Sequence, residues 1–242
     1  MGVARDASSQ RSWPREPGRA TLADNLARVR STIDAHAARA GRNPGDVSIL
    51  AVTKTLPVSR IQEAIAAGLR VLGENRVQEA MPKIESIGQD QVAWHLIGHL
   101  QRNKVRFIEG HFAMVQSIDS LELVQALDQR LTRALDVLIE VNVGEEPQKT
   151  GALPSDLMAI ADAVGTSARL RLGGLMTVAP QSQDPEQARP IFQRLAGLRT
   201  ELVERLAIPL PILSMGMSED YGVAIEEGAT MLRLGRALFG AR

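Results

Sequence analysis

The sequence predicts a single closed (β/α)₈ barrel of parallel strands, preceded by one additional helix. Short apolar segments alternate strictly with amphipathic segments from residue 47 to residue 235, which indicates parallel strands joined by helical crossovers. Polar segments suited to one binding site follow the first, seventh and eighth apolar segments. Those strands are neighbours only if the sheet closes on itself, so a barrel is favoured over an open doubly wound sheet.

The additional helix is predicted to begin after Thr21. Thr21 and Asp24 have the spacing of a capping box, and Gly41 followed by Pro44 predicts the end of the helix. Apolar residues three and four apart form one stripe along it, and they are Leu22, Leu26, Val29, Ile33 and Ala37. Such a stripe predicts a helix that packs one face against the barrel.

Eight strands are predicted where apolar residues run almost without interruption, as expected of parallel strands covered on both faces. These strands are residues 47–54, 70–74, 92–97, 112–118, 136–143, 171–177, 211–216 and 230–235. Ser59 with Gln62, and Asn75 with Gln78, resemble capped helix starts after the first two strands. The later helices are predicted at residues 103–110, 120–131, 154–165, 185–206 and 218–228.

Composition narrows the class of protein. The 242 residues are 44% hydrophobic, enough for the core of one large α/β domain. Lys+Arg and Asp+Glu number 28 each, so no net field attracts nucleic acid or an acidic membrane. Cysteine is absent, which excludes disulfides and fits a reducing compartment, and we expect the cytoplasm. Residues 1–20 lack the apolar core of a secretory signal and are predicted to be a disordered tail before the domain at 21–242.

Lys54 ends the first predicted strand, in the stretch LAVTKTLP. In a parallel barrel the chemistry lies at the C-terminal ends of the strands. Apolar surroundings disfavour the charged form of an amine, and an uncharged lysine forms Schiff bases with carbonyl compounds. The alternative is a solvated lysine, or one paired with a carboxylate such as Glu74.

Small residues follow the seventh and eighth strands. Ser214, Gly216 and Ser218 lie in SMGMSED, and Gly235 precedes Arg236 in RLGRALFG. Phosphate sites in barrels recur in the loops after strands seven and eight, where backbone N–H groups face an anion. Each segment alone could be an ordinary glycine turn. Together with Lys54 they predict a site for a phosphate ester that carries an aldehyde.

Six ordered motifs resemble the YggS/PROSC family of pyridoxal phosphate (PLP) homeostasis proteins. They are LAVTKTLPVSRIQEAIAAG, LGENRVQEA, WHLIGHLQRNKV, GGLMTVAP, LSMGMSEDYGVAI and LRLGRALFG. The resemblance runs from about residue 21 to the C-terminus. It implies a single (β/α)₈ barrel similar to the N-terminal domain of bacterial alanine racemase.

The resemblance also implies how PLP would be held. Lys54 matches the lysine that carries PLP as a Schiff base. Ser214, with the backbone around Met215 and Gly216, matches the phosphate-binding loop. The backbone N–H groups of Gly235 and Arg236 match the pair that completes the phosphate site.

Two further residues would contact the ring. Arg233 matches the arginine that faces the pyridine nitrogen, and Asn75 is expected near the ring. An arginine keeps its proton, so a nitrogen facing it stays unprotonated and the ring is a weaker electron sink. The alternative for Arg233 is a structural ion pair with Glu226 or Glu227.

The sequence departs from the family pattern at two positions and offers one further candidate. Arg76 stands where the family often has an aromatic residue, and Arg236 where it often has Thr. A contact made by a Thr hydroxyl would be lost, whereas one made by backbone N–H would survive. Lys104, in the segment the family writes LQxNK, is a candidate for a second PLP site.

Two histidines and two polar segments have simple structural explanations. His95 and His99 have a spacing seen in metal sites, but they span a strand end and a glycine, so no metal is expected. QRNKVR is expected to be a solvated helix start and not a nucleic-acid patch. Glu146, Lys149 and Gly151 match a family pattern near the cofactor, with a salt-bridged loop as the alternative.

The expected function is that of a PLP-binding protein in intracellular vitamin B6 homeostasis, without established catalytic turnover. Apo PLP-dependent enzymes are the candidate partners, and a monomer is expected. The first alternative is a PLP-dependent racemase-like enzyme. Two-base racemisation needs a second base, and the one tyrosine, Tyr221, falls in the phosphate-loop segment. The second alternative is a Schiff-base aldolase that acts on a sugar phosphate without PLP.

Overall fold

The computed structural model describes residues 20–240, so the predicted tail lies outside the described residues except for Ala20. Eight parallel strands pair in chain order, and β1 pairs with β8, which confirms the closed barrel. The strands are β1 (Ser48–Val52), β2 (Val71–Glu74), β3 (Ala93–Leu96), β4 (Met114–Ile118), β5 (Leu135–Glu140), β6 (Leu170–Met176), β7 (Ile212–Ser214) and β8 (Met231–Leu234).

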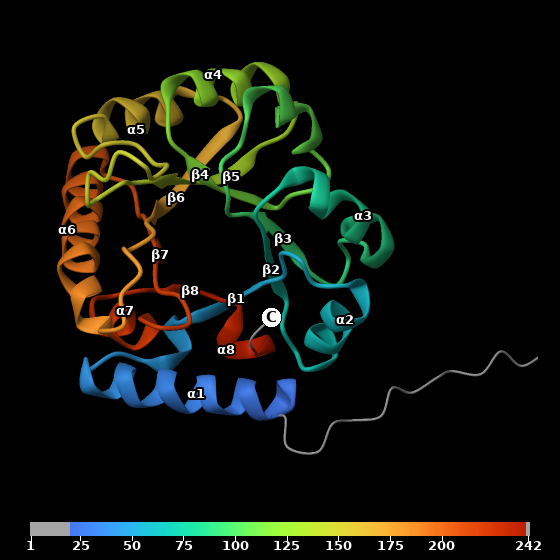
Figure 1. The fold of residues 1–242 in the computed structure, drawn as a ribbon. Coiled ribbons are helices and arrows are strands. Elements are labelled where there is room, and N and C mark those ends of the chain that lie inside the picture. The colour runs from blue at the N-terminus through green and yellow to red at the C-terminus, as the bar shows by residue number, and fades with distance from the viewer. Residues whose placement is uncertain (1–19, 241–242) are drawn as a thin grey trace, which may run out of the picture.

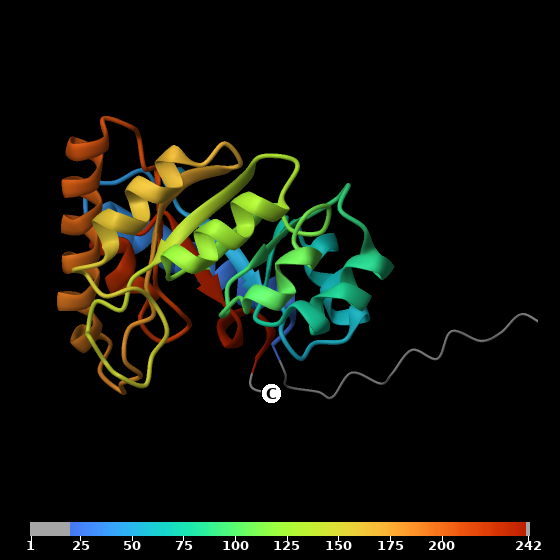
Figure 2. The same ribbon diagram turned by 90° about the horizontal axis from the view of Figure 1, so that it is seen from above.

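Helices form a ring around the barrel (Figure 1). They are α1 (Leu22–Arg39), α2 (Val58–Ala66), α3 (Val77–Ile87), α4 (Leu121–Arg130), α5 (Leu157–Thr166), α6 (Arg189–Leu206), α7 (Tyr221–Glu226) and α8 (Arg236–Phe239). Three short 3₁₀ helices are η1 (Pro44–Asp46), η2 (Arg102–Phe107) and η3 (Pro185–Ala188). In the turned view, α6 stands on one side of the strands and α2 and α3 on the other (Figure 2). None of the helices within residues 20–240 is both long and apolar enough to cross a membrane.

The additional N-terminal helix is confirmed, together with its capping box. The Asp24 amide donates to Thr21 Oγ1 at 3.1 Å, and the Thr21 amide donates to Asp24 Oδ2 at 2.9 Å. α1 lies along α7 and α8, over the seam where β8 meets β1 (Figure 1). Asn25 fastens it there, since its buried Nδ2 donates to the Leu238 carbonyl at 2.8 Å.

Several predicted helix starts were wrong by a few residues. Pro57 and Arg76 occupy the N-cap positions of α2 and α3, in place of the predicted Ser59 and Asn75, and neither makes a side-chain cap. The segment at 103–110 is the 3₁₀ helix η2 and not an α-helix. α7 is shorter than predicted and begins at Tyr221, and the Ser218 hydroxyl accepts instead from the Ala237 amide of α8, at 3.0 Å.

Alternating side chains divide the core into two layers. Ala51, Leu72 and Leu232 belong to the large apolar core that includes the helices. The side chains at the neighbouring positions of the strands point into the barrel. The buried apolar residues of the interior are Leu50, Val52, Met114, Leu138, Met176 and Met231. Above them, toward the C-terminal ends of the strands, the interior becomes polar, and the candidate site lies there.

Candidate functional site

Lys54 lies in a turn just beyond β1. The Leu56 amide donates to the Thr53 carbonyl at 3.1 Å and closes the turn over Lys54 and Thr55. The Lys54 side chain is exposed, so it lacks the apolar walls expected of it. Among residues 20–240 it has no hydrogen-bond or ion-pair partner. Its amine is therefore free to meet a carbonyl compound.

A group of charged side chains lies behind that turn, between the barrel and α3, and we call Glu74, Glu79 and Lys83 the outer cluster. Lys83 Nζ donates to Glu74 Oε1 and to Glu79 Oε1, both at 2.8 Å. Thr53 Oγ1 also donates to Glu74 Oε1, at 2.6 Å. Burial raises the pKa of Glu74, and the hydrogen bonds from Lys83 and Thr53 oppose that shift. The pairing of Lys54 with Glu74 considered above is therefore wrong, because Lys83 takes that carboxylate.

A second polar group crosses the barrel interior, and we call His95, Gln116, Ser214 and Arg233 the inner network. Ser214 Oγ donates to Gln116 Oε1 at 2.6 Å and accepts from Arg233 Nη1 at 2.8 Å. Gln116 Nε2 lies 2.9 Å from His95 Nδ1. Arg233 also donates to the carbonyls of Ser214 and Thr177, both at 2.6 Å. Three of the five guanidinium donors are thereby used, and two remain for another acceptor.

Burial sets the charges of this network. It lowers the pKa of Arg233 to about 10, while the carboxylates of Glu140 and Asp220 act in the opposite direction. It lowers the pKa of His95 to about 4, with a smaller opposing effect of Asp136. At neutral pH Arg233 is therefore charged and His95 is neutral.

The alternative role of Arg233 as a structural ion pair is wrong. Glu226 and Glu227 lie on the outside of the barrel, where both contact Arg189, at 2.7 and 2.5 Å. His36 of α1 approaches Glu226 as well, at 2.8 Å. The charge of Arg233 thus has carbonyl and hydroxyl oxygens, and no carboxylate, as its hydrogen-bond partners within the described residues.

The loops after β7 and β8 present unpaired backbone donors. Among residues 20–240, no group accepts from the N–H of Gly216, Gly235 or Arg236. The Met215 amide is occupied, because it donates to the Met231 carbonyl at 3.1 Å. Adjacent unpaired N–H groups of this kind suit an anion such as a phosphate.

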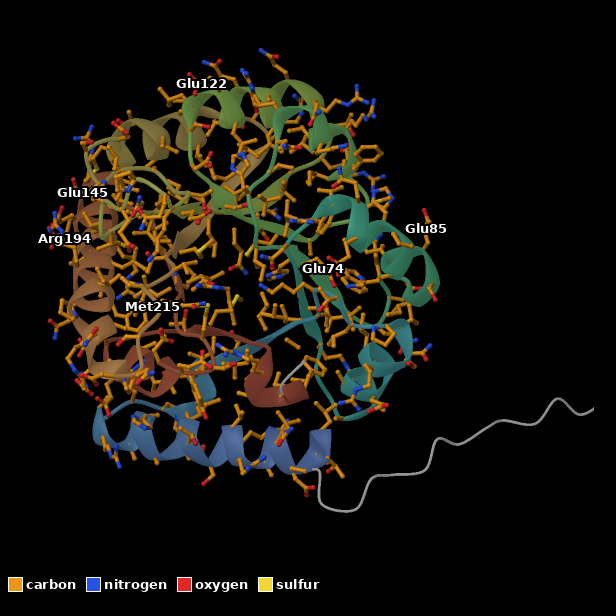
Figure 3. The ribbon with its side chains drawn as sticks, in the orientation of Figure 1. Glu74, Glu85, Glu122, Glu145, Arg194 and Met215 are labelled. Carbon is orange, nitrogen blue, oxygen red and sulfur yellow. The ribbon has the colours of Figure 1, made fainter. Side chains whose placement is uncertain are left out.

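Gly216 is required by its conformation. Its φ is +91°, and a Cβ there would lie 2.6 Å from the Ala224 side chain. Met215 instead points its side chain into the apolar core and is fully buried, inside the ring of helices, whereas Glu85, Glu122 and Arg194 lie on the outer rim (Figure 3). The backbone around residues 215–216, and not its side chains, thus faces the site.

Arg236 lies at the start of α8 with its side chain exposed. Its guanidinium forms an ion pair with Glu219 at 2.8 Å. Both residues line a cavity of about 280 Å³ beside the loop at 180–188. The Arg236 side chain is therefore engaged by Glu219, while its backbone N–H has no acceptor among residues 20–240.

Asn75 and Lys104 share a different cavity, of about 610 Å³, at the ends of β2 and β3. Asn75 Oδ1 is buried there and has no partner among the described residues. Lys104 lies over the Phe107 ring, 6.0 Å from its centre. Arg76 is exposed at the mouth of the same cavity. The orphaned oxygen of Asn75 is thus an acceptor with unused hydrogen-bonding capacity.

Two other predictions concern residues away from this region. His95 lies inside the barrel, whereas His99 contacts Asp119 at 3.0 Å. The described residues contain no cluster of His, Asp or Glu that could hold a metal ion. Glu146 pairs with Lys149 at 2.5 Å, as expected of a salt-bridged loop.

Sequence reasoning missed several polar residues of the site. Among them are Lys83, Gln116, Glu140 and Thr177, which are buried, and Glu79 of the outer cluster. Glu140 Oε1 accepts from Thr150 Oγ1 at 2.8 Å, its Oε2 has no partner within residues 20–240, and burial raises its pKa. A signal was present, since Gln116 and Glu140 interrupt otherwise apolar strands. A polar residue at an inward position there is either paired or functional.

Comparison with known proteins places the chain among relatives of similar length. The family model described as alanine racemase, N-terminal domain, matches residues 23–242. A pyridoxal phosphate homeostasis protein of Aquifex aeolicus is 41% identical over 222 residues, which cover 90% of this chain and 97% of the relative. One of Pseudomonas aeruginosa is 44% identical over 225 residues, which cover 92% and 96% of the two chains.

Solved structures agree. PipY of Synechococcus elongatus, solved with PLP bound, is 35% identical with a TM-score of 0.80, and the match covers 91% of this chain and all of PipY. Alanine racemase of Corynebacterium glutamicum, 15% identical with a TM-score of 0.69, shares the fold over 90% of this chain and 61% of its own length. The chain therefore belongs to the pyridoxal phosphate homeostasis protein family, whose barrel is that of the alanine racemase N-terminal domain.

Proposed function

We propose that the chain binds PLP, holds it as a Schiff base on Lys54 and takes part in intracellular PLP homeostasis without catalytic turnover. The observation that carries the proposal is a juxtaposition. The free amine of Lys54 follows β1, and the unpaired N–H groups of Gly216, Gly235 and Arg236 follow β7 and β8. β8 pairs with both β7 and β1, so these ends adjoin. An amine beside an anion site suits an aldehyde that carries a phosphate.

Each residue has a separate task in this proposal. The backbone N–H groups of Gly216, Gly235 and Arg236 bind the phosphate, beside Ser214 and Met215. PLP supplies an aldehyde that condenses with the Lys54 amine and releases water. Water is not excluded from Lys54 by protein, since its side chain is exposed.

Two residues act on the ring. The remaining donors of Arg233 face the pyridine nitrogen in this proposal and, because Arg233 keeps its proton at neutral pH, that nitrogen stays unprotonated. Asn75 offers its unpartnered Oδ1 beside the ring. The ring is then a weak electron sink, which suits storage of PLP more than chemistry on amino acids.

The fit of PLP rests on atoms that lack partners. The described residues leave Asn75 Oδ1 orphaned and three backbone donors unpaired at the loops after β7 and β8. The related PipY was solved with PLP bound. The unpaired atoms would suit PLP or a sugar phosphate, the substrate class of the aldolase alternative, and the PLP-bound relative favours PLP.

A PLP-dependent racemase-like enzyme is the second candidate, because the family model is that of the alanine racemase N-terminal domain. Against it stands the position of Tyr221, the only tyrosine in the sequence, which packs at the start of α7 against the core. Conversion of L-alanine or another amino acid by the purified protein would support this candidate.

The proposed partners are apo PLP-dependent enzymes, the proposed state is a monomer and the proposed compartment is the cytoplasm. Transfer is testable by mixing the PLP-loaded protein with an apo PLP enzyme and following the return of that enzyme's activity. An equal amount of free PLP is the control.

Absorbance and mass spectrometry test the central proposal. We expect an imine band with PLP that borohydride abolishes, with a pyridoxyl group on Lys54, and no such band in Lys54→Ala. Lys104→Ala is the matched lysine control and should retain the band. A wild-type protein without the band, or a Lys54→Ala variant that keeps it, would contradict the proposal.

A further inference from the structure

Two side chains of α3 form hydrogen bonds with the backbone of the turn that carries Lys54, one on each side of the lysine. Lys83 Nζ donates to the Thr53 carbonyl at 2.9 Å, on the N-terminal side. Glu79 Oε1 accepts from the Thr55 amide on the C-terminal side. Both side chains come from the helix that follows β2, and neither touches the Lys54 side chain.

The backbone conformation of Thr55 explains why the turn needs these hydrogen bonds. Its φ is +62°, in the left-handed region, although it is β-branched. It occupies the third position of the turn, where glycine or asparagine is the usual way to reach positive φ. A strained residue persists only where its surroundings hold it, and such residues gather at ligand sites. The hydrogen bond from the Thr55 amide to Glu79 stabilises this strained conformation.

The outer cluster also controls what Lys54 can pair with. Glu74 is fully buried, and Lys83 is 7% exposed. Lys83 contacts both carboxylates of the cluster and offsets part of their negative charge, and neither carboxylate pairs with the Lys54 amine. An amine paired with a carboxylate stays charged and is a poor nucleophile.

We propose that Glu79 and Lys83 are positioning residues for Lys54, which hold the strained turn in place and keep the Lys54 amine unpaired. The inference deepens the proposed function and rests on it. In this inference α3 takes part in the reaction of Lys54 with an aldehyde. It takes no part in phosphate binding, because the proposed phosphate site lies in the loops after β7 and β8.

Two ligands distinguish reaction at Lys54 from binding of the ring and phosphate. With PLP, the reaction at Lys54 is measured as the rate at which the borohydride-trapped pyridoxyl adduct on Lys54 accumulates. Pyridoxine 5′-phosphate lacks the aldehyde and reports only on the ring and phosphate sites. Glu79→Ala should slow formation of the Lys54 adduct about tenfold and leave the affinity for pyridoxine 5′-phosphate unchanged. Glu79→Gln keeps an oxygen acceptor for the Thr55 amide and should restore most of the rate.

Glu85→Ala is the matched control. Glu85 lies on the same helix but at the outer rim, where it is exposed (Figure 3). Neither readout should change in that variant. An unchanged adduct rate in Glu79→Ala would overturn the inference, and so would a parallel fall of both readouts, which would mean damage to the fold. Failure of the wild type to form the adduct would overturn the proposed function as well.

Lys83 needs a variant that does not strand a buried charge. Lys83→Met combined with Glu74→Gln removes both charges together. The double variant should slow the adduct as Glu79→Ala does, with pyridoxine 5′-phosphate affinity retained. A wild-type adduct rate in this variant would overturn the role of Lys83.

Discussion

The outer cluster and the inner network each bury one cation, and they compensate it differently. Lys83, behind the sheet, contacts the carboxylates of Glu74 and Glu79. Arg233, inside the barrel and 4% exposed, donates instead to a hydroxyl and two carbonyls. The ammonium thus has carboxylates as hydrogen-bond partners, whereas the guanidinium has neutral oxygens, and the carboxylates of Glu140 and Asp220 act on it without a hydrogen bond.

This difference separates structure from binding. A cation held by carboxylates has little attraction left for a ligand, so the outer cluster fixes the backbone around Lys54. A cation held by neutral oxygens keeps both its charge and spare donors, so it can act on whatever enters the barrel mouth. Glu140, whose Oε2 is unpartnered among the described residues, adds a carboxylate near the inner network.

The largest expected effect is a loss of stability when the ion pair between Lys83 and Glu74 in the outer cluster is broken. Lys83→Met alone leaves the buried Glu74 without its partner and should lower the free energy of unfolding by about 3–5 kcal/mol. Adding Glu74→Gln should recover most of that loss, because the stranded charge is removed. Urea unfolding of the wild type and the two variants measures both values. Equal stability of the single and double variants would contradict the assignment of the loss to charge.

The second effect, on the inner network, depends on pH. Burial lowers the pKa of folded His95 to about 4 from an ordinary 6.5, so the unfolded chain takes up a proton first as pH falls. Stability from His95 is therefore complete above pH 6.5 and is lost between 6.5 and about 4. The loss from pH 7 to pH 5 should be about 2 kcal/mol.

His95→Gln isolates that contribution. Buried carboxylates with raised pKa values, such as Glu140, titrate in both proteins and cancel in the comparison. The variant should lose less stability than the wild type from pH 7 to pH 5, as followed by urea unfolding at each pH. Identical losses in both proteins would show that His95 is not the titrating group.

The smallest expected effect concerns the exposed ion pair between Arg236 and Glu219, which serves as a comparison for the two buried cations. The Arg236 and Glu219 side chains are 60% and 47% exposed, so their ion pair should contribute less than about 1 kcal/mol. Arg236→Thr should hardly move the melting temperature. It should also retain the affinity for pyridoxine 5′-phosphate, because the backbone N–H of residue 236 is unchanged. A large loss of affinity would mean that the Arg236 side chain, and not its backbone, binds the phosphate.

The sequence predicted the architecture well because alternation of apolar and amphipathic segments is a property of neighbouring residues. The eight strands, their order and the helix at 22–39 are confirmed. Helix starts were less predictable. Ser59 has the right chemistry for a cap, but Pro57 is the N-cap of α2, and the hydroxyl of Ser218, where a helix was predicted to start, accepts from the Ala237 amide of α8. Competition for one hydroxyl depends on contacts distant in sequence.

The candidate site was predicted as a set of residues and not as an arrangement. Motifs singled out Lys54 and the loops at 214–216 and 233–236, and whether these hold PLP stays a prediction. The exposure of Lys54 was one of the alternatives, and the sequence could not decide between them because the outcome depends on where β1 ends. The engagement of the Ser214 hydroxyl by Gln116 and Arg233 depends on three strands meeting inside the barrel.

Closure of the barrel also has a consequence for the order of events during synthesis. Ser48, at the start of β1, donates to the carbonyl of Thr230, which is 182 residues later in the chain. Until β8 has emerged from the ribosome, β1 has an open edge and Lys54 has no neighbouring β8 loop. Contacts this distant carry a large loop-closure entropy and form late in folding. The proposed capture of an aldehyde on Lys54 should therefore become possible only with the last strand, so that nascent chains expose this lysine without the rest of the proposed site.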